Sequence, residues 1–248
     1  MQCVTLDHLT LLADDIEAFA SAVAAGPPDA PIGGCPGWTL LDLGEHLGAV
    51  HRWAHAAIVT SAMPQLDPAS DPAPREPQAL GEWVRTGGAR LLGALHALDP
   101  EQPTWHPFPV EPKLAGLWRR RQAQEASIHR WDAERAIGLT PTIDPVFADD
   151  GIDEYWGVML PRLVIRQQLA VPSSVFGVAT TDTRGSWVVD GTTGGVVVRL
   201  DGAEPAAVLR GTANDVLLAL WGRPVPDGAL AVEGDQSVSD AWLALGGA

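Results

Sequence analysis

The stretch that decides the fold is Arg121-Gln-Ala-Gln-Glu125-Ala-Ser-Ile-His129-Arg-Trp-Asp132-Ala-Glu134-Arg135-Ala136-Ile-Gly138. It predicts one long helix that ends at a glycine. Glu125 and His129 are four residues apart, so their side chains project from one face, one turn apart. Such a pair can supply two metal ligands. The same spacing is common in solvated surface pairs, so this helix by itself leaves both interpretations open.

A second segment, Gly37-Trp38-Thr39-Leu-Leu-Asp42-Leu43-Gly-Glu45-His46-Leu47, predicts another amphipathic helix that begins at a Thr cap. His46 falls on the apolar side of this helix. A lone histidine there is often a core residue with one hydrogen bond. His51 and His55 are themselves four residues apart, and by spacing they compete with His46 for the role of metal ligand.

The two segments together, Trp-Thr-x-x-Asp-Leu-x-x-His-Leu and Glu-x-x-x-His-Arg-x-Asp-x-Glu-x-Ala-x-Gly, resemble the mycothiol-dependent maleylpyruvate isomerase family. The resemblance implies a DinB-like four-helix bundle in which His46, Glu125 and His129 hold zinc or another divalent metal. It favours His46 over His51 and His55, which stay candidates for supporting positions or for the surface.

Periodicity organises the rest of the chain. Helices are expected at about residues 5–24, 39–60, 78–98, 113–137 and 148–168, with irregular proline-rich crossovers at 61–78 and 99–112. Gly87-Gly88 is expected to weaken the third helix, and Pro161 to kink the fifth. Beyond Pro172 the pattern alternates, which predicts strands at 174–180, 186–189, 196–200, 207–210 and 229–233 and helices at 212–221 and 237–245.

This change of periodicity predicts an α+β protein with two domains, a helical bundle over residues 1–168 and an α+β domain over residues 172–248. The segment from Gly211 to Arg223 resembles the C-terminal domain of the same family, a small unit similar to sterol carrier proteins. Asp132 lies one turn beyond His129, where it is placed either to orient that ligand or to form a surface salt bridge with Arg135 or Arg121.

Composition excludes several classes of partner. The net charge of −15 over 248 residues argues against nucleic acid or an anionic membrane, because both require basic surface. Cys3 and Cys35 are too few for a disulfide framework and do not form a metal-binding pair, so we interpret them as bystanders. The start of the chain lacks a leader pattern, and no apolar run is long enough for a membrane span, so a cytoplasmic protein is expected. The composition suggests a GC-rich genome, which fits the actinobacterial hosts of the family.

The resemblance also implies a chemistry. Zinc with three protein ligands keeps a fourth position open, where it can bind a thiol and stabilise the thiolate. The expected cosubstrate is mycothiol, whose thiolate attacks an electrophilic small molecule, and Arg223 or Arg210 is expected to hold a substrate carboxylate. Isomerase and mycothiol S-transferase share these features. The alternative is a non-catalytic small-molecule or lipid-binding protein with a structural metal site.

Overall fold

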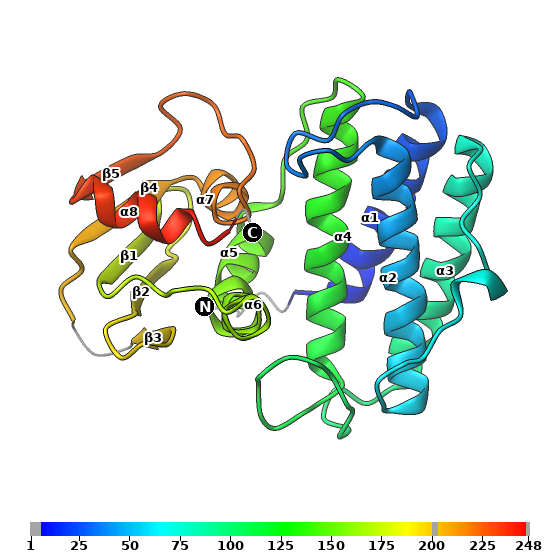
Figure 1. The fold of residues 1–248 in the computed structure, drawn as a ribbon, viewed down its shortest axis with the longest axis horizontal. Helices are drawn as coiled ribbons and strands as arrows, with labels where there is room; N and C mark the ends of the chain where they lie inside the picture. Colours follow the sequence, from blue (N-terminus) through cyan, green and yellow to red (C-terminus); the bar gives the residue numbers. More distant parts are fainter. Residues whose placement is uncertain (1–5, 200–202, 247–248) are drawn as a thin grey trace. The chain divides into compact units, whose positions relative to one another are not determined.

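A computed structural model of the protein describes residues 6–199 and 203–246 (Figure 1). The chain divides into two compact units. The first unit runs to Pro141 without the short segment Phe108–Val110, and the second contains that segment and everything from Thr142 onward. This matches the expected α+β class, with a helical part followed by a mixed sheet with helices.

The first unit is a bundle of four long helices, α1 (His8–Ala25), α2 (Leu40–Thr60), α3 (Pro77–Ala97) and α4 (Gly116–Ala136). Helices α1 and α2 each pack against both α3 and α4, and they meet each other only slightly (Figure 1). Consecutive helices α1 and α2 therefore lie across the bundle from each other. This arrangement places α2 beside α4, the two helices that carry the expected metal ligands.

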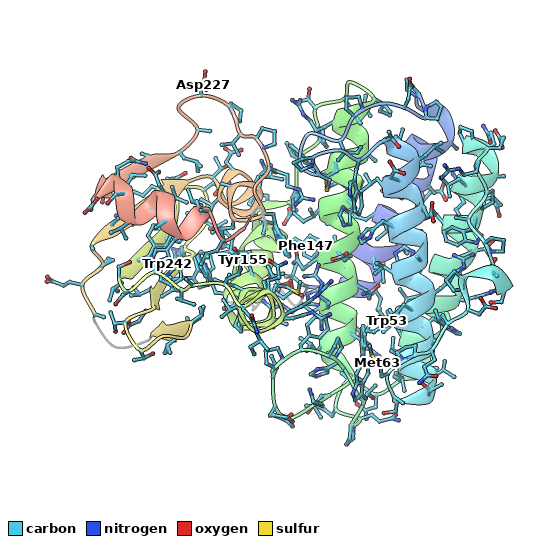
Figure 2. The ribbon with its side chains drawn as sticks, viewed as in Figure 1. Trp53, Met63, Phe147, Tyr155, Asp227 and Trp242 are labelled. Atoms are coloured by element: carbon cyan, nitrogen blue, oxygen red, sulfur yellow. The ribbon has the colours of Figure 1, made fainter. Side chains whose placement is uncertain are left out.

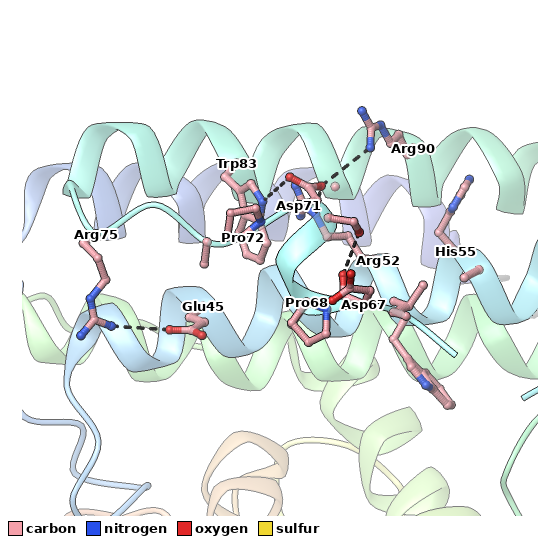
Figure 3. Close-up of a pocket in the computed structure, with 17 residues that line it drawn as sticks. Glu45, Arg52, His55, Asp67, Pro68, Asp71, Pro72, Arg75, Trp83 and Arg90 are labelled. Atoms are coloured by element: carbon pink, nitrogen blue, oxygen red, sulfur yellow. Dashed lines mark hydrogen bonds and ion pairs between the residues drawn. The ribbon is translucent and has the colours of Figure 1, made fainter. Parts of the chain in front are cut away.

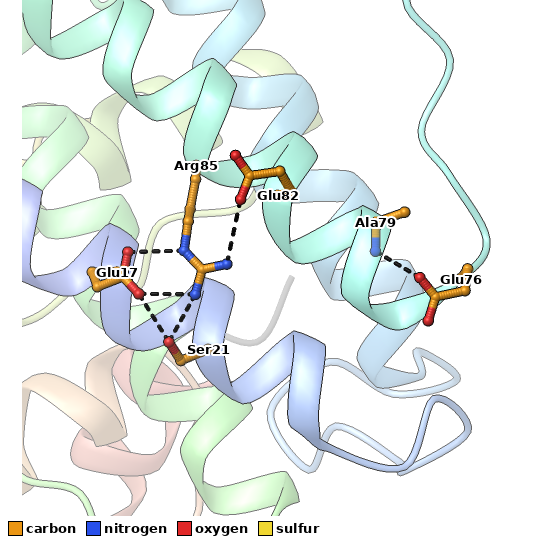
Figure 4. Close-up of polar contacts among 6 residues, drawn as sticks. All are labelled: Glu17, Ser21, Glu76, Ala79, Glu82 and Arg85. Atoms are coloured by element: carbon orange, nitrogen blue, oxygen red, sulfur yellow. Dashed lines mark hydrogen bonds and ion pairs between the residues drawn. The ribbon is translucent and has the colours of Figure 1, made fainter.

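Local sequence explains where these helices begin. Thr39 and Asp42 form the expected capping box at the start of α2, because each side chain accepts from the backbone N–H of the other residue. Glu76 caps α3 by accepting from the N–H groups of Gln78 and Ala79, and Figure 4 shows the bond from Ala79. The crossover before α3 is irregular as expected, except for a single turn of 3-10 helix at Pro68–Ser70.

Glycine lets α3 approach its neighbours closely, and α3 is continuous through Gly87 and Gly88. A Cβ atom added to Gly88 would lie 2.8 Å from the Ile16 side chain of α1, closer than packed carbon atoms approach. On the outside of the same helix pair, both Nε and Nη2 of Arg85 donate to the Glu17 carboxylate at 2.8 Å, and Nη2 also donates to Ser21 (Figure 4). This bidentate pair is partly exposed, so packing stabilises the α1–α3 contact more than charge does.

The second unit begins with α5 (Pro145–Glu154), a π-helical segment (Tyr155–Met159) and α6 (Leu160–Gln167). Five strands follow in the order β3-β2-β1-β4-β5, namely β1 (Val175–Thr180), β2 (Ser186–Asp190), β3 (Val197–Arg199), β4 (Ala207–Gly211) and β5 (Ala231–Gly234). Strands β1 and β4 are parallel, and the other neighbours are antiparallel. Helices α7 (Ala213–Leu220) and α8 (Gln236–Leu243) complete the unit.

Two expectations about this region need correction. The predicted boundary at residue 172 lies too late, because the helical segment after Pro145 belongs with the sheet. Its Trp156 is buried, with ring centroids 6.3 Å from Phe176 of β1 and 5.9 Å from Trp242 of α8 (Figure 2 labels Trp242). The predicted helix over residues 148–168 is also interrupted by the π-helical segment just before Pro161.

The remaining expected strands and helices are present within a few residues of their predicted bounds. The last residue of the strand expected at 196–200 lies outside the described residues, as does Cys3. Among the residues that the structure describes, no helix is long and apolar enough to cross a membrane.

Candidate metal centre

The three expected ligands lie together in the first unit. His46 comes from the first half of α2, and Glu125 and His129 come from successive turns of α4. The capping box at Thr39 fixes where α2 begins and so sets the position of His46 along the helix. Trp38, just before that cap, packs its ring edge-on against the His46 imidazole with centroids 5.0 Å apart. The tryptophan of the Gly37-Trp38-Thr39 segment thus orients the histidine.

The spacing of these three side chains is compatible with a metal site. One carboxylate oxygen of Glu125, Oε1, is 3.5 Å from Nε2 of His46 and 3.5 Å from Nε2 of His129. One donor atom from each residue can be chosen so that all three lie within 4.8 Å of one another. Zinc bonds nitrogen and oxygen at about 2.0–2.2 Å, so neighbouring ligands of a tetrahedral site lie about 3.3–3.5 Å apart. The observed separations equal that edge and are long for hydrogen bonds.

Electrostatics keep the Glu125 carboxylate ionised. Burial alone would raise its pKa, but the guanidinium of Arg121 and the imidazoles of His129 and His46 outweigh burial and hold the pKa well below its usual range. Nη2 of Arg121 donates to the second oxygen, Oε2, at 2.7 Å. Oε1 is thereby left for the two histidines. The spacing of four residues between Arg121 and Glu125 is the sequence signal for this salt bridge.

Asp132 supports the second histidine. Its side chain is fully buried, so the expected alternative of a surface salt bridge is wrong. Its Oδ2 lies 3.2 Å from Nδ1 of His129, and in the neutral imidazole an Nδ1–H that donates to this carboxylate leaves Nε2 unprotonated on the side of Glu125. Burial alone would lower the pKa of His129, but hydrogen bonds to Asp132 and Glu125 raise it.

Cys35 lies unexpectedly close to this centre. Its Sγ is within 4.8 Å of a His129 ring nitrogen and of an Asp132 carboxylate oxygen. The residue comes from the loop between α1 and α2 and is partly buried against the bundle core. Cys35 therefore lies beside the donor group, and its interpretation as a bystander in the reaction stays a prediction. Only the fold of that loop brings the thiol here, because nothing in the local sequence pairs Cys35 with α4.

The other two histidines of α2 do not join the donor group. His51 is completely buried, and neither of its ring nitrogens has a hydrogen-bond partner among the described residues. Burial lowers the pKa of His51 to about 3, so it is neutral in the folded protein. His55 is partly exposed and lines a cavity between α2 and α3. The structure thus brings together His46, and not this pair, with Glu125 and His129.

The two arginines expected to bind substrate belong to the second unit. Arg210 lies on β4, where its Nε donates to Glu233 of β5 at 2.8 Å. Arg223 follows α7, and its Nη1 donates to the carbonyl of Trp221 at 2.8 Å. Their role toward a substrate carboxylate stays a prediction.

The fold and the donor cluster define a two-unit α+β protein whose helical bundle carries a candidate metal centre. The sequence matches the family model described as the mycothiol maleylpyruvate isomerase N-terminal domain over residues 9–134. It matches the model of the corresponding C-terminal domain over residues 147–241. The chain therefore belongs to the mycothiol maleylpyruvate isomerase family. The gap between the two matches contains the division after Pro141.

Solved structures agree at the level of the fold. A crystal structure of the mycothiol-dependent maleylpyruvate isomerase superposes with a TM-score of 0.57 at 14% identity, covering 92% of each chain. A histidine-to-alanine variant of that enzyme gives a TM-score of 0.56 at 13% identity, again with 92% of each chain covered. No curated protein matches the chain by sequence.

Proposed function

We propose that the protein is a zinc-dependent enzyme that uses mycothiol, either as a maleylpyruvate isomerase or as a mycothiol S-transferase acting on a small electrophile. Family membership supports the thiol cosubstrate. The observation that supports metal binding is the pair of 3.5 Å separations from one Glu125 oxygen to the two histidine nitrogens. Two nitrogens and one oxygen leave a fourth tetrahedral position for an external ligand, which is typical of catalytic zinc.

Zinc bound here would supply one property, stabilisation of the thiolate form of an external thiol at neutral pH. The surrounding residues of this chain prepare the donor atoms. Arg121 holds the Glu125 carboxylate ionised, and Asp132 holds His129 with Nε2 free to bind. Trp38 covers His46, whose side chain is 33% exposed compared with 11% for His129. The His46 side is therefore the more open side of the site.

The reaction also requires a group that binds the substrate carboxylate. We assign this role to Arg223 or Arg210, because a guanidinium binds a carboxylate through two parallel hydrogen bonds. Arg210 is 42% exposed and already bonded to Glu233, so a substrate would have to displace that carboxylate. Arg223 donates to the backbone carbonyl of Trp221 and not to a carboxylate in that bond.

The decisive experiment measures metal content and thiol dependence together. Purified wild type should contain about one zinc per chain, and His129→Ala should lose it. His55→Ala is the matched control, because it removes an imidazole from α2 outside the donor group and should retain zinc. Zinc retained in His129→Ala would refute the ligand assignment.

Activity separates the remaining possibilities. Mycothiol with maleylpyruvate tests isomerisation, and mycothiol with monochlorobimane, a thiol-reactive electrophile, tests transfer. Turnover in one assay that requires both zinc and mycothiol would assign the reaction class. Zinc binding without thiol-dependent turnover of either electrophile would favour the non-catalytic binding protein.

A further inference from the structure

The cavity that His55 lines lies in the first unit and does not include the candidate metal ligands. It has a volume of about 600 Å³, is partly open to solvent, and is lined by residues of α2, α3 and the crossover that connects them (Figure 3). Drug-sized ligands occupy cavities of about 300–1,000 Å³, so its size suits a small molecule. None of His46, Glu125 and His129 lines it. Glu45 does, but His46 projects about 100° further around α2.

The floor of the cavity is a fixed aromatic and cationic surface. The guanidinium of Arg52 stacks over the Trp83 ring, 3.6 Å from its centroid. Asp71 of the crossover accepts from both, from Arg52 Nε at 2.7 Å and from Trp83 Nε1 at 3.0 Å (Figure 3). The stacked pair also depends on two glycines. A Cβ on Gly48 would lie 2.2 Å from the Trp83 ring, and one on Gly87 would lie 2.3 Å from Arg52 Nη1.

The walls are largely apolar. Trp53 contributes from α2, and its own ring is fixed by contacts with Trp105 and Trp118, whose centroids lie 6.1 Å and 5.8 Å away. Leu66 contributes from the crossover although 49% of its surface is exposed to solvent, which is unfavourable for a leucine unless something covers it. Aromatic walls and a flat stacked floor favour a planar ligand.

Three carboxylates, those of Glu45, Asp67 and Asp71, line the cavity beside its arginines, and Glu45 lies 3.7 Å from Nη1 of Arg75. Asp71 is bonded as described, and Asp67 Oδ1 accepts from the Ala69 N–H. Nη1 of Arg90 lies 4.0 Å from the Asp71 carboxylate, beyond hydrogen-bonding distance, and the Arg90 side chain is 61% exposed. His55 lines the same end of the cavity (Figure 3). A guanidinium held near but not bonded to a carboxylate can turn to an anionic group on a ligand.

We propose that this cavity is a second small-molecule site, for a planar aromatic compound that carries one anionic group. The aromatic part lies between Trp53, Leu66 and the Arg52–Trp83 floor, and the anionic group is bound by Arg90. The site is independent of the metal centre and of the reaction proposed for it.

Binding is tested with anilinonaphthalene sulfonate, a fluorescent aromatic anion, titrated into the full-length protein. Ala49→Phe fills the cavity from α2 and should weaken binding about tenfold or more. Ala89→Phe is the matched control, since Ala89 is exposed on α3 outside the cavity and should leave the affinity unchanged. Arg90→Gln should weaken binding about three- to tenfold, whereas Arg184→Gln, an equal change of charge on an exposed residue of the second unit, should not.

Phenylnaphthylamine, which lacks the sulfonate, tests the anionic requirement and should bind more weakly than the sulfonate, with no effect of Arg90→Gln. Thermal unfolding checks that each variant is folded, and Arg90→Gln on the surface keeps the test valid if Ala49→Phe does not fold. Equal affinity in Ala49→Phe and Ala89→Phe, or no binding to wild type, would overturn the site. Equal affinity for the uncharged probe and the sulfonate would overturn the proposal that the ligand carries an anionic group.

Discussion

Replacement of Asp132 by asparagine tests whether this buried carboxylate prepares His129 to bind zinc. The Asp132 side chain is fully buried and lies 3.2 Å from Nδ1 of His129. Asparagine keeps the volume and one acceptor oxygen but removes the charge that fixes the imidazole tautomer. Removing such a partner typically lowers metal affinity by about 10- to 100-fold, or about 1.4–2.7 kcal/mol.

Because the amide can still accept from Nδ1–H, Asp132→Asn should lie near the tenfold end of that range. Asp132→Ala, which leaves the imidazole without its acceptor, should approach the hundredfold end and also reduce stability. Zinc affinity is measured by competition with a chromophoric chelator at one fixed pH. The reference variant is Glu134→Gln, which changes a carboxylate to an amide two residues along α4, where the partner is Arg130 and not His129.

Two results would refute this reasoning. Wild-type zinc affinity in a folded Asp132→Asn would mean that the hydrogen bond does not orient the ligand. An equal loss of affinity in Glu134→Gln would mean that the effect comes from the general charge of α4.

Four further predictions follow from the same site and fold. His51→Ala should retain zinc, in contrast to His129→Ala, as metal analysis of both will show. In metal-free protein, burial lowers the pKa of His51 to about 3 from 6.5, so stability is full above 6.5 and falls as the pH drops through this window. The free energy of unfolding should fall by at most about 1.4 kcal/mol per pH unit. Urea unfolding should show that this pH dependence is smaller in His51→Phe than in wild type. Cys35→Ser should keep mycothiol-dependent turnover. If the variant lost turnover while still binding zinc, the Cys35 thiol would be part of the mechanism. Residues 1–141 alone should bind zinc but show a lower kcat/KM than the full chain, because they lack Arg223; equal values would remove that arginine from the site.

The long helices could be predicted from the sequence because their information is local. Apolar residues at helical spacing, the Thr39 cap and the proline-rich crossovers are properties of neighbouring residues, and the structure reproduces them. The domain boundary could not be found in this way. A change from helical to alternating periodicity marks where strands begin, whereas Trp156 joins the sheet through contacts with residues distant in the chain.

For the candidate site, too, the sequence predicted one part and the tertiary structure decided the other. Sequence by itself determined that Glu125 and His129 share a face, and the family resemblance selected His46 from three histidines of one helix. Tertiary structure decided which groups surround them, since packing of α2 and the preceding loop against α4 brings His46 and Cys35 close to His129. It also buried Asp132, which changed a possible surface charge into a fixed hydrogen-bond acceptor. The spacing of residues along one helix fixes the directions in which their side chains project. The distance between side chains on different helices depends on packing across the whole core.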